Sequence, residues 1–124
     1  MEIYCCNCKE VVDAKLVDGN SVYPHRPDLY DKSFYICEKC HNFVGCHKDG
    51  TPLGTIPSPE IKRYRMQLHS MMDPLWKNKI ITRAKLYELI SSKLGYRYHN
   101  GETRSVDECK KVLSIVKQLK EDLM

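Results

Sequence analysis

Apolar residues in the second half of the chain recur with the spacing of amphipathic helices. The run Ser58-Pro59-Glu60 is typical of a helix start, with serine as the cap and proline at the first helical position. Apolar side chains then return every three or four residues as far as Met71 or Met72, which predicts a helix. Asp73-Pro74 is predicted to end or restart this helix, because proline has no backbone N–H.

Two more helices are predicted further along. Thr82 can cap the first of them, and Gly95 can terminate it in the left-handed conformation. Residues 105–108 have the Ser-x-x-Glu capping-box pattern, which predicts the start of another helix. Its apolar stripe contains Cys109, Val112, Leu113, Val116 and Leu119.

The first half has short apolar runs separated by turn residues instead. Residues 11–17 are mostly apolar, and Asp18-Gly19-Asn20 is a turn signal after which residues 21–23 are expected to return as a strand. Strand composition recurs at residues 34–36 and 43–44. The pattern therefore predicts a β-rich first half.

Together these elements predict an α+β fold. A zinc-ribbon-like module is expected over residues 1–57, and a section of about three helices over residues 58–124, packed with it as one unit. The two parts also differ in charge. Residues 1–60 hold 6 Lys/Arg and 9 Asp/Glu, a balance of −3, whereas residues 61–124 hold 14 Lys/Arg and 7 Asp/Glu, a balance of +7.

Composition narrows the class of protein. The 124 residues are 42% hydrophobic and 29% charged, with a mean hydropathy of −0.51, which argues against both a membrane protein and a disordered chain. The N-terminus lacks the basic and apolar regions of a signal peptide, so we expect a cytoplasmic protein, or one in the host cytoplasm if a phage encodes it. Seven cysteines in a reducing compartment favour metal ligands or buried thiols over disulfides.

Four of the cysteines have the spacing of a structural zinc site. Cys5 and Cys8 form one C-x-x-C turn, and Cys37 and Cys40 form another. Two such turns facing each other supply the four tetrahedral thiolate ligands of one Zn²⁺. A redox pair and plain buried thiols are the competing interpretations. The redox interpretation lacks the βαβ pattern expected around a thioredoxin-like motif.

The remaining cysteines have several possible roles. Cys46-His47 can replace a zinc ligand or help to form a second site, or it can be a buried thiol beside a surface histidine. Cys6 lies between two ligands and is expected to be a bystander. Cys109 lies on an apolar helix stripe and is expected to pack in the core.

A proline-bounded loop carries the residues with the most catalytic character. His25, Arg26 and Asp28 lie between or beside two prolines, and His47 can converge with them if the two C-x-x-C turns face each other. An acid–base pair beside an arginine is the start of a hydrolase or nuclease site. No nucleophile or open metal position accompanies it, so we expect a bracing, zinc-supporting or binding loop and a protein that is not an enzyme.

Basic residues gather in the predicted helical section. Eight of the 24 residues from 62 to 85 are lysine, arginine or histidine, and only Asp73 opposes them. Such a cluster suits phosphate contacts. A solvated helix face and a surface for a protein partner are the alternatives. The residues expected to contact nucleic acid are Lys62, Arg63, Arg65 and Lys77.

Several motifs also resemble a known family. They include the two C-x-x-C turns, Val22-Tyr-Pro-His-Arg-Pro-Asp-Leu29, Val44-Gly-Cys-His47, Pro52-Leu-Gly-Thr55 and Asp73-Pro-Leu-Trp76. The chain resembles small zinc-finger-containing proteins of unknown function from bacteria and their phages. The resemblance implies a zinc-binding fold with Cys5, Cys8, Cys37 and Cys40 as ligands, and it implies no activity.

The function predicted from the sequence is a zinc-stabilised, non-enzymatic module that contacts nucleic acid through its basic helical half. The alternative is a phage or mobile-element protein that binds and inhibits or redirects a host protein, such as a defence or transcription component. In that case the acidic first half is the expected contact surface. Neither function involves a membrane or an identified small-molecule substrate, and the cofactor expected in both is one structural Zn²⁺.

Overall fold

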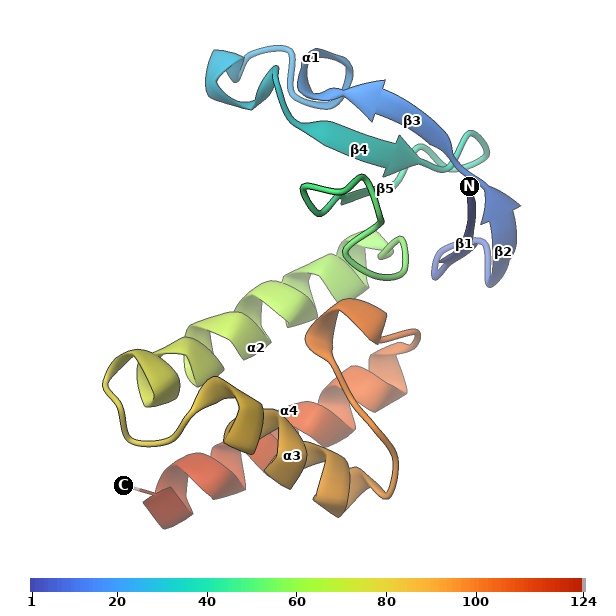
Figure 1. The fold of residues 1–124 in the computed structure, drawn as a ribbon. Coiled ribbons are helices and arrows are strands. Elements are labelled where there is room, and N and C mark those ends of the chain that lie inside the picture. Colours follow the sequence, from blue (N-terminus) through green and yellow to red (C-terminus); the bar gives the residue numbers. More distant parts are fainter. Residues whose placement is uncertain (124) are drawn as a thin grey trace. The chain divides into compact units, whose positions relative to one another are not determined.

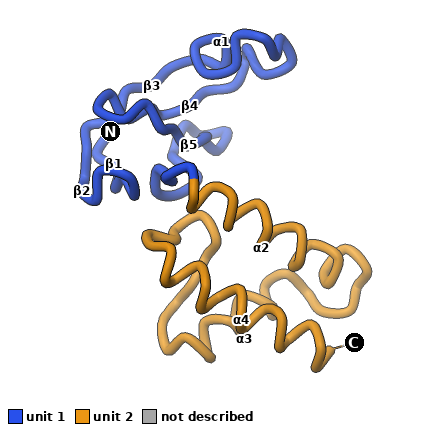
Figure 2. The backbone as a smooth tube through the Cα atoms, turned by 180° about the vertical axis from the view of Figure 1, so that it is seen from behind, with its two compact units in different colours: residues 1–59 blue, residues 60–124 orange. Residues whose placement is uncertain are grey.

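Two small antiparallel sheets form the first part of the chain (Figure 1). The computed structural model describes residues 1–123, and its contacts divide into two units, Met1–Pro59 and a second from Glu60 onward (Figure 2). The first sheet pairs two strands, and the second has the order β3-β4-β5. The strands are β1 (Glu2–Cys5), β2 (Glu10–Asp13), β3 (Lys15–Asp18), β4 (Ser33–Ile36) and β5 (Phe43–Gly45).

The expected strand at residues 21–23 is wrong. Gly19–Val22 form a one-turn helix, α1, and a 3-10 turn, η1 (Pro27–Leu29), follows it. The Asp18 carboxylate accepts hydrogen bonds from the Ser21 N–H (3.0 Å) and the Ser21 hydroxyl (3.1 Å), so it caps this turn. A Cβ at Gly19 would lie 1.6 Å from the Leu29 carbonyl oxygen, so this position has no room for a side chain.

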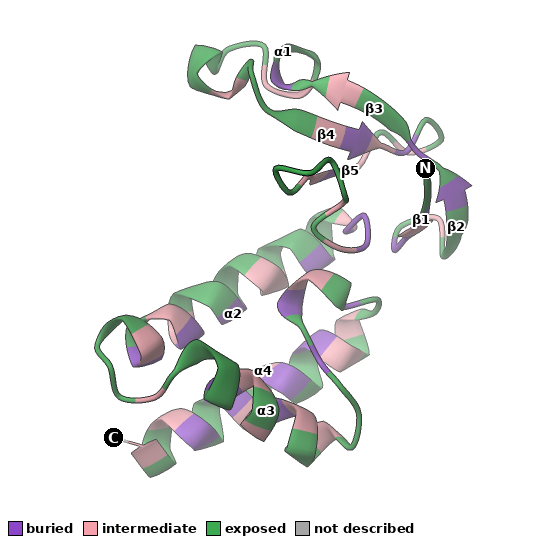
Figure 3. Ribbon diagram, in the orientation of Figure 1, coloured by how far each residue is buried: buried purple, intermediate pink, exposed green. Residues whose placement is uncertain are grey.

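The core of the first unit lies between the strands and the cysteine turns. Successive side chains of β4 and β5 point to opposite faces of the sheet, so Tyr35 and Val44 are buried on one face. They pack with Ile3, Val12 and Ile56, and Figure 3 shows where buried positions lie on the strands. Cys5 and Cys37, which are both 0% exposed, belong to the same cluster. A module of this size builds only a small apolar core, and a bound metal is the usual supplement.

Three helices form the second unit. They are α2 (Pro59–Lys77), α3 (Arg83–Leu94) and α4 (Val106–Leu123), with a 3-10 turn, η2 (Asn100–Glu102), before α4. Their inward faces form one apolar core that contains Leu68, Met72, Leu75, Leu86, Ile90, Tyr98, Val112, Val116 and Leu119. Within residues 1–123, no helix has the length and hydropathy needed to cross a membrane. The predicted α+β fold with about three C-terminal helices is confirmed.

The predicted helix-terminal features at Thr82, Gly95 and Ser105 form. The Thr82 hydroxyl accepts from the Lys85 N–H at 3.1 Å, and Gly95 ends α3 with a φ of 85°. The Ser105 hydroxyl accepts from the Glu108 N–H at 3.2 Å. The Glu108 carboxylate reaches back to the N–H of Arg104, one residue before the cap.

Pro74 does not end the first long helix, contrary to the prediction. Helix α2 continues to Lys77 with Pro74 inside it. Proline removes one backbone hydrogen bond, but Met72 and Leu75 on either side of it are both buried in the helical core. Burial of two large side chains contributes about 3–6 kcal/mol, which offsets the local cost of about 3 kcal/mol.

Candidate metal centre

The four cysteines of the two C-x-x-C turns lie at matching places in the first unit. Cys5 ends β1 and Cys37 directly follows β4, while Cys8 and Cys40 lie in the turns that come next. The two turns have the same backbone geometry. The Lys9 N–H donates to the Cys5 carbonyl at 2.8 Å, and the His41 N–H donates to the Cys37 carbonyl at 2.7 Å. Lys9 and His41 both have a left-handed backbone, with φ of 59° and 64°. Both turns therefore present their sulfur atoms in the same way.

The sulfur atoms have the separations of a tetrahedral zinc site. Cys5 Sγ lies 3.5 Å from Cys40 Sγ, Cys8 Sγ lies 3.8 Å from Cys37 Sγ, and all four lie within 4.8 Å of one another. Four sulfur atoms at about 2.3 Å from a tetrahedral Zn²⁺ are themselves about 3.8 Å apart. The cluster thus fits one structural zinc ion.

The electrostatics of the cluster also call for a cation. Burial opposes ionisation of Cys40, but N–H groups of Asn42 and the Cys5 thiol donate to its sulfur and lower its pKa to about 7. Burial and the neighbouring sulfur atoms raise the pKa of Cys8 to about 12. Cys40 therefore ionises more readily than Cys8, whose thiolate is favoured when a positive ion lies beside it. Zinc binding here therefore releases protons.

Residues outside the two turns support the cluster. The Asn42 side-chain amide donates to Cys40 Sγ at 3.2 Å. Residues 55–56 lie beside β1, where Ile56 N–H donates to the Tyr4 carbonyl and the Ile56 carbonyl accepts from Cys6 N–H. The sequence analysis did not identify this support. An amide side chain two residues after the second cysteine of a turn was the available signal for Asn42.

The other three cysteines lie outside the cluster. Cys6 is buried, and its sulfur lies 3.5 Å from the Thr55 hydroxyl. Cys46 is half-buried, and burial raises the pKa of its thiol. Cys109 is fully buried on α4. Across residues 1–123, the four-cysteine cluster is the only group with metal-binding geometry, and neither Cys46 nor His47 belongs to it.

Cys109→Ala is expected to leave the zinc content unchanged and to cost about 1 kcal/mol of folding free energy, because it removes one small buried group from the helical unit. Metal analysis and urea denaturation measure the two quantities. Loss of zinc from this variant would contradict the separation of the helical unit from the metal site.

The proline-bounded loop is exposed. The Arg26 guanidinium forms a two-pronged ion pair with Asp28, with Nε to Oδ1 at 3.0 Å and Nη2 to Oδ2 at 2.9 Å. The Tyr30 hydroxyl donates to the Pro24 carbonyl across the loop. His25 is exposed beside this pair. The geometry is that of a braced loop, in which Asp28 occupies the arginine fork that an anionic substrate would need.

The four basic residues expected to contact nucleic acid do not share one environment. Lys62, Arg63 and Lys77 are exposed on α2. Arg65 is half-buried, and its guanidinium donates to the Thr103 hydroxyl at 2.8 Å and the Thr103 carbonyl at 2.9 Å. Thr103 is completely buried. Arg65 therefore holds the segment before α4 in place, a use that the helical pattern alone does not reveal.

Paired C-x-x-C turns on antiparallel strands, with four sulfur atoms at tetrahedral separations, define a zinc finger. The family model for a zinc-finger-containing domain of unknown function matches residues 1–119, and the chain belongs to that family. No curated protein matches the chain, and no solved structure matches it. The protein is thus a zinc-binding module, and the resemblance noted in the sequence is confirmed.

Proposed function

We propose that this zinc-binding module binds nucleic acid through the basic surface of its helical unit. The observation that carries the proposal is the exposure of the basic run. Of the eight basic residues between positions 62 and 85, all except Arg65 are exposed, and Asp73 is the one acidic residue among them. An exposed run of this kind attracts phosphate groups and releases their counterions.

Contacts at the end of α2 and the start of α3 strengthen the proposal. The Lys77 ammonium lies 5.6 Å from the Trp76 ring centroid, and the Arg83 guanidinium lies 5.7 Å from that of Tyr87. Trp76 Nε1–H also donates to the Asp73 carboxylate at 3.2 Å. The single acidic group of the run thus accepts a hydrogen bond from Trp76, and two cations lie beside aromatic rings, a combination that nucleic-acid-binding surfaces use.

The zinc has a structural role in this proposal. Four thiolates fill the tetrahedral coordination of Zn²⁺ and leave no position for water or substrate. The braced Arg26–Asp28 pair likewise offers no nucleophile. A binding protein rather than an enzyme is the function that this geometry supports.

A salt titration with generic duplex DNA tests the proposal. Each phosphate contact contributes about −0.9 to the slope of log affinity against log salt, so Lys62→Ala with Lys77→Ala should flatten the slope by up to about 2 units. Lys110→Ala with Lys117→Ala is the matched control, because it removes the same charge from exposed positions of α4. The control should change the slope much less.

Absence of binding at low salt, or equal slopes for the two double variants, would contradict the nucleic-acid proposal. The second candidate function, binding and redirecting a host protein, would then be the better supported of the two. The acidic balance of residues 1–60 favours it, and a zinc with four thiolates adds a site charge of −2. Capture of a partner that is lost when Glu2 and Asp13, paired across β1 and β2, are replaced would support this candidate.

A further inference from the structure

One face of the three-stranded sheet carries aromatic side chains. Strand register places Val17, Phe34 and Gly45 in one row and Ile36 and Phe43 in the next, on the face opposite the buried Tyr35 and Val44. Tyr23, which directly follows α1, joins the two phenylalanines, with ring centroids 5.4–5.7 Å apart and edge-to-face angles. All three rings are half-buried, so part of each remains accessible.

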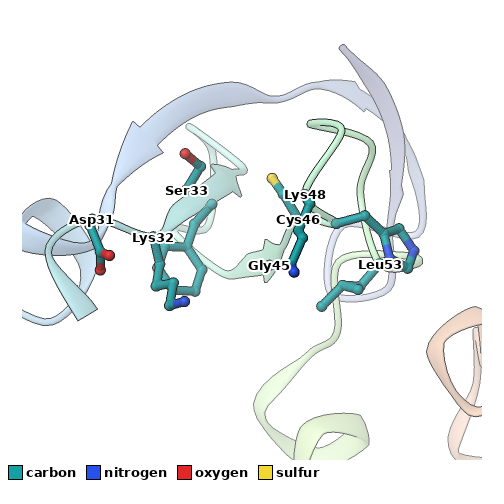
Figure 4. Close-up of a pocket in the computed structure, with 9 residues that line it drawn as sticks. Asp31, Lys32, Ser33, Gly45, Cys46, Lys48 and Leu53 are labelled. Atoms are coloured by element: carbon teal, nitrogen blue, oxygen red, sulfur yellow. The ribbon is translucent and has the colours of Figure 1, made fainter. Parts of the chain in front are cut away.

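A pocket of about 380 Å³ opens beside this aromatic group (Figure 4). Phe34, Gly45 and Leu53 are among the residues that line it. A Cβ added to Gly45 would lie 3.1 Å from Leu53 Cδ1 and 3.9 Å from Phe34 Cε1, so a larger side chain there would push against two side chains that line the pocket. The volume is within the roughly 300–1,000 Å³ range of small-molecule sites.

Positive charge surrounds this pocket, in contrast to the acidic first half of the chain. Lys32 lies on one side of it, and Lys48 lies on the other beside Cys46 (Figure 4). His47 also lines the pocket, and Asp31 is its one carboxylate. The excess of cationic groups favours an anionic ligand, and the aromatic and aliphatic walls favour one with a flat apolar part.

We propose that this pocket binds an unpaired nucleotide, with the base against Phe34 and the phosphate between Lys32 and Lys48. A base inside a duplex exposes only its edges, so a site that takes its face selects single strands or free nucleotides. The proposal goes beyond the basic helical surface, because it concerns the first unit and leaves residues 62–85 unchanged in its test.

The experiment is an NMR titration of the full-length, zinc-loaded protein. The probes are a short oligothymidylate, the duplex of the same length, and thymidine monophosphate. We expect the single strand to shift the amide signals of Gly45 and Leu53, and the duplex to leave them unchanged. Shifts with the monophosphate at similar affinity identify the free nucleotide as the ligand, and shifts with the oligomer alone identify the strand.

Two variants probe the pocket. Gly45→Val pushes against Leu53 and Phe34 in the pocket lining and should weaken single-strand affinity at least about fivefold, the lower end of what one base–aromatic stack contributes. Because one phosphate lies between the two lysines, Lys32→Ala with Lys48→Ala should flatten the salt slope by about 0.7 units on a single strand. Lys110→Ala with Lys117→Ala is the control, because it removes equal charge from exposed positions that do not line the pocket.

Unchanged Gly45 and Leu53 signals with both the single strand and the monophosphate would overturn the proposal. Equal effects of the two lysine double variants, combined with full affinity of Gly45→Val, would overturn it too. Zinc content and circular dichroism are to be measured for each variant to check that it is folded. If Gly45→Val disturbs β5, the lysine variants still test the pocket. Duplex binding through the helical surface is measured separately, so either proposal can fail alone.

Discussion

Replacing Cys37 with serine is expected to release the zinc and unfold the first unit. Cys37 is 0% exposed and lies within 3.8 Å of the Cys8 sulfur, at the centre of both the metal cluster and the small apolar core. Serine is not among the usual ligands of Zn²⁺, and structural zinc contributes about 10–16 kcal/mol of apparent binding free energy. That exceeds the total stability of most domains of this size.

The loss of folded structure should be confined to residues 1–59. The helical unit has its own core, built around Leu68, Leu86 and Val112, which contains none of the metal-binding cysteines. We therefore expect the variant to keep most of its helical circular dichroism. In an NMR spectrum, the amide signals of the strands should collapse while those of α2, α3 and α4 persist.

Cys6→Ser is the matched control. Cys6 lies between two ligands and is also buried, yet its sulfur lies beside the Thr55 hydroxyl, and a serine hydroxyl can hydrogen-bond there. This variant should bind one zinc per chain and melt close to the parent protein. Full zinc content in Cys37→Ser, or zinc loss in Cys6→Ser, would contradict the assignment of ligands.

Local patterns predict the parts of this structure that depend on a few neighbouring residues. The spacing Cys5-x-x-Cys8 predicts a tight turn that brings both sulfur atoms to one side. Thr82 and Gly95 mark the ends of α3, because threonine caps a helix start with its hydroxyl and glycine adopts the left-handed backbone at a helix end. These features need no information from distant residues, so the sequence is sufficient for them.

The sequence-based predictions are wrong where contacts with residues distant in the sequence determine the local structure. Pro74 lies within a helix because Met72 and Leu75 are buried by residues far along the chain. Residues 21–23 form no strand because Asp18 caps a turn and because Gly19 fits against Leu29. The pocket beside Phe34 combines side chains from β4, β5 and the following loop, which no single stretch of sequence places together.

The zinc site and the two proposed binding surfaces have distinct physical origins. The metal cluster stabilises the first unit, which holds Phe34 and Gly45 in the register that leaves a pocket between them. The helical unit folds around its own apolar core and displays the basic run on exposed positions. Removing zinc should therefore abolish binding at the pocket while leaving duplex binding by the helical unit largely intact.

Arg65→Ala is expected to destabilise the helical unit by about 2–3 kcal/mol. The substitution removes two hydrogen bonds to Thr103, whose carbonyl and hydroxyl are completely buried. Hydrogen bonds from charged groups contribute about 1.5–3 kcal/mol, and a buried acceptor left without its donor costs about 1–3 kcal/mol. Thr103 in turn donates to the carbonyl of the buried Asn100, so the disturbance reaches η2.

Two further variants separate this structural role from charge. Arg63→Ala removes an equal charge from an exposed position of the same helix and should change stability by less than about 0.5 kcal/mol. Arg65→Lys keeps the charge but lacks the planar fork that reaches both Thr103 oxygen atoms, so it should also be destabilised. Urea denaturation followed by helical circular dichroism measures all three. If Arg65→Ala matched Arg63→Ala in stability while flattening the salt slope of DNA binding, Arg65 would be a phosphate contact and its bond to Thr103 would be dispensable.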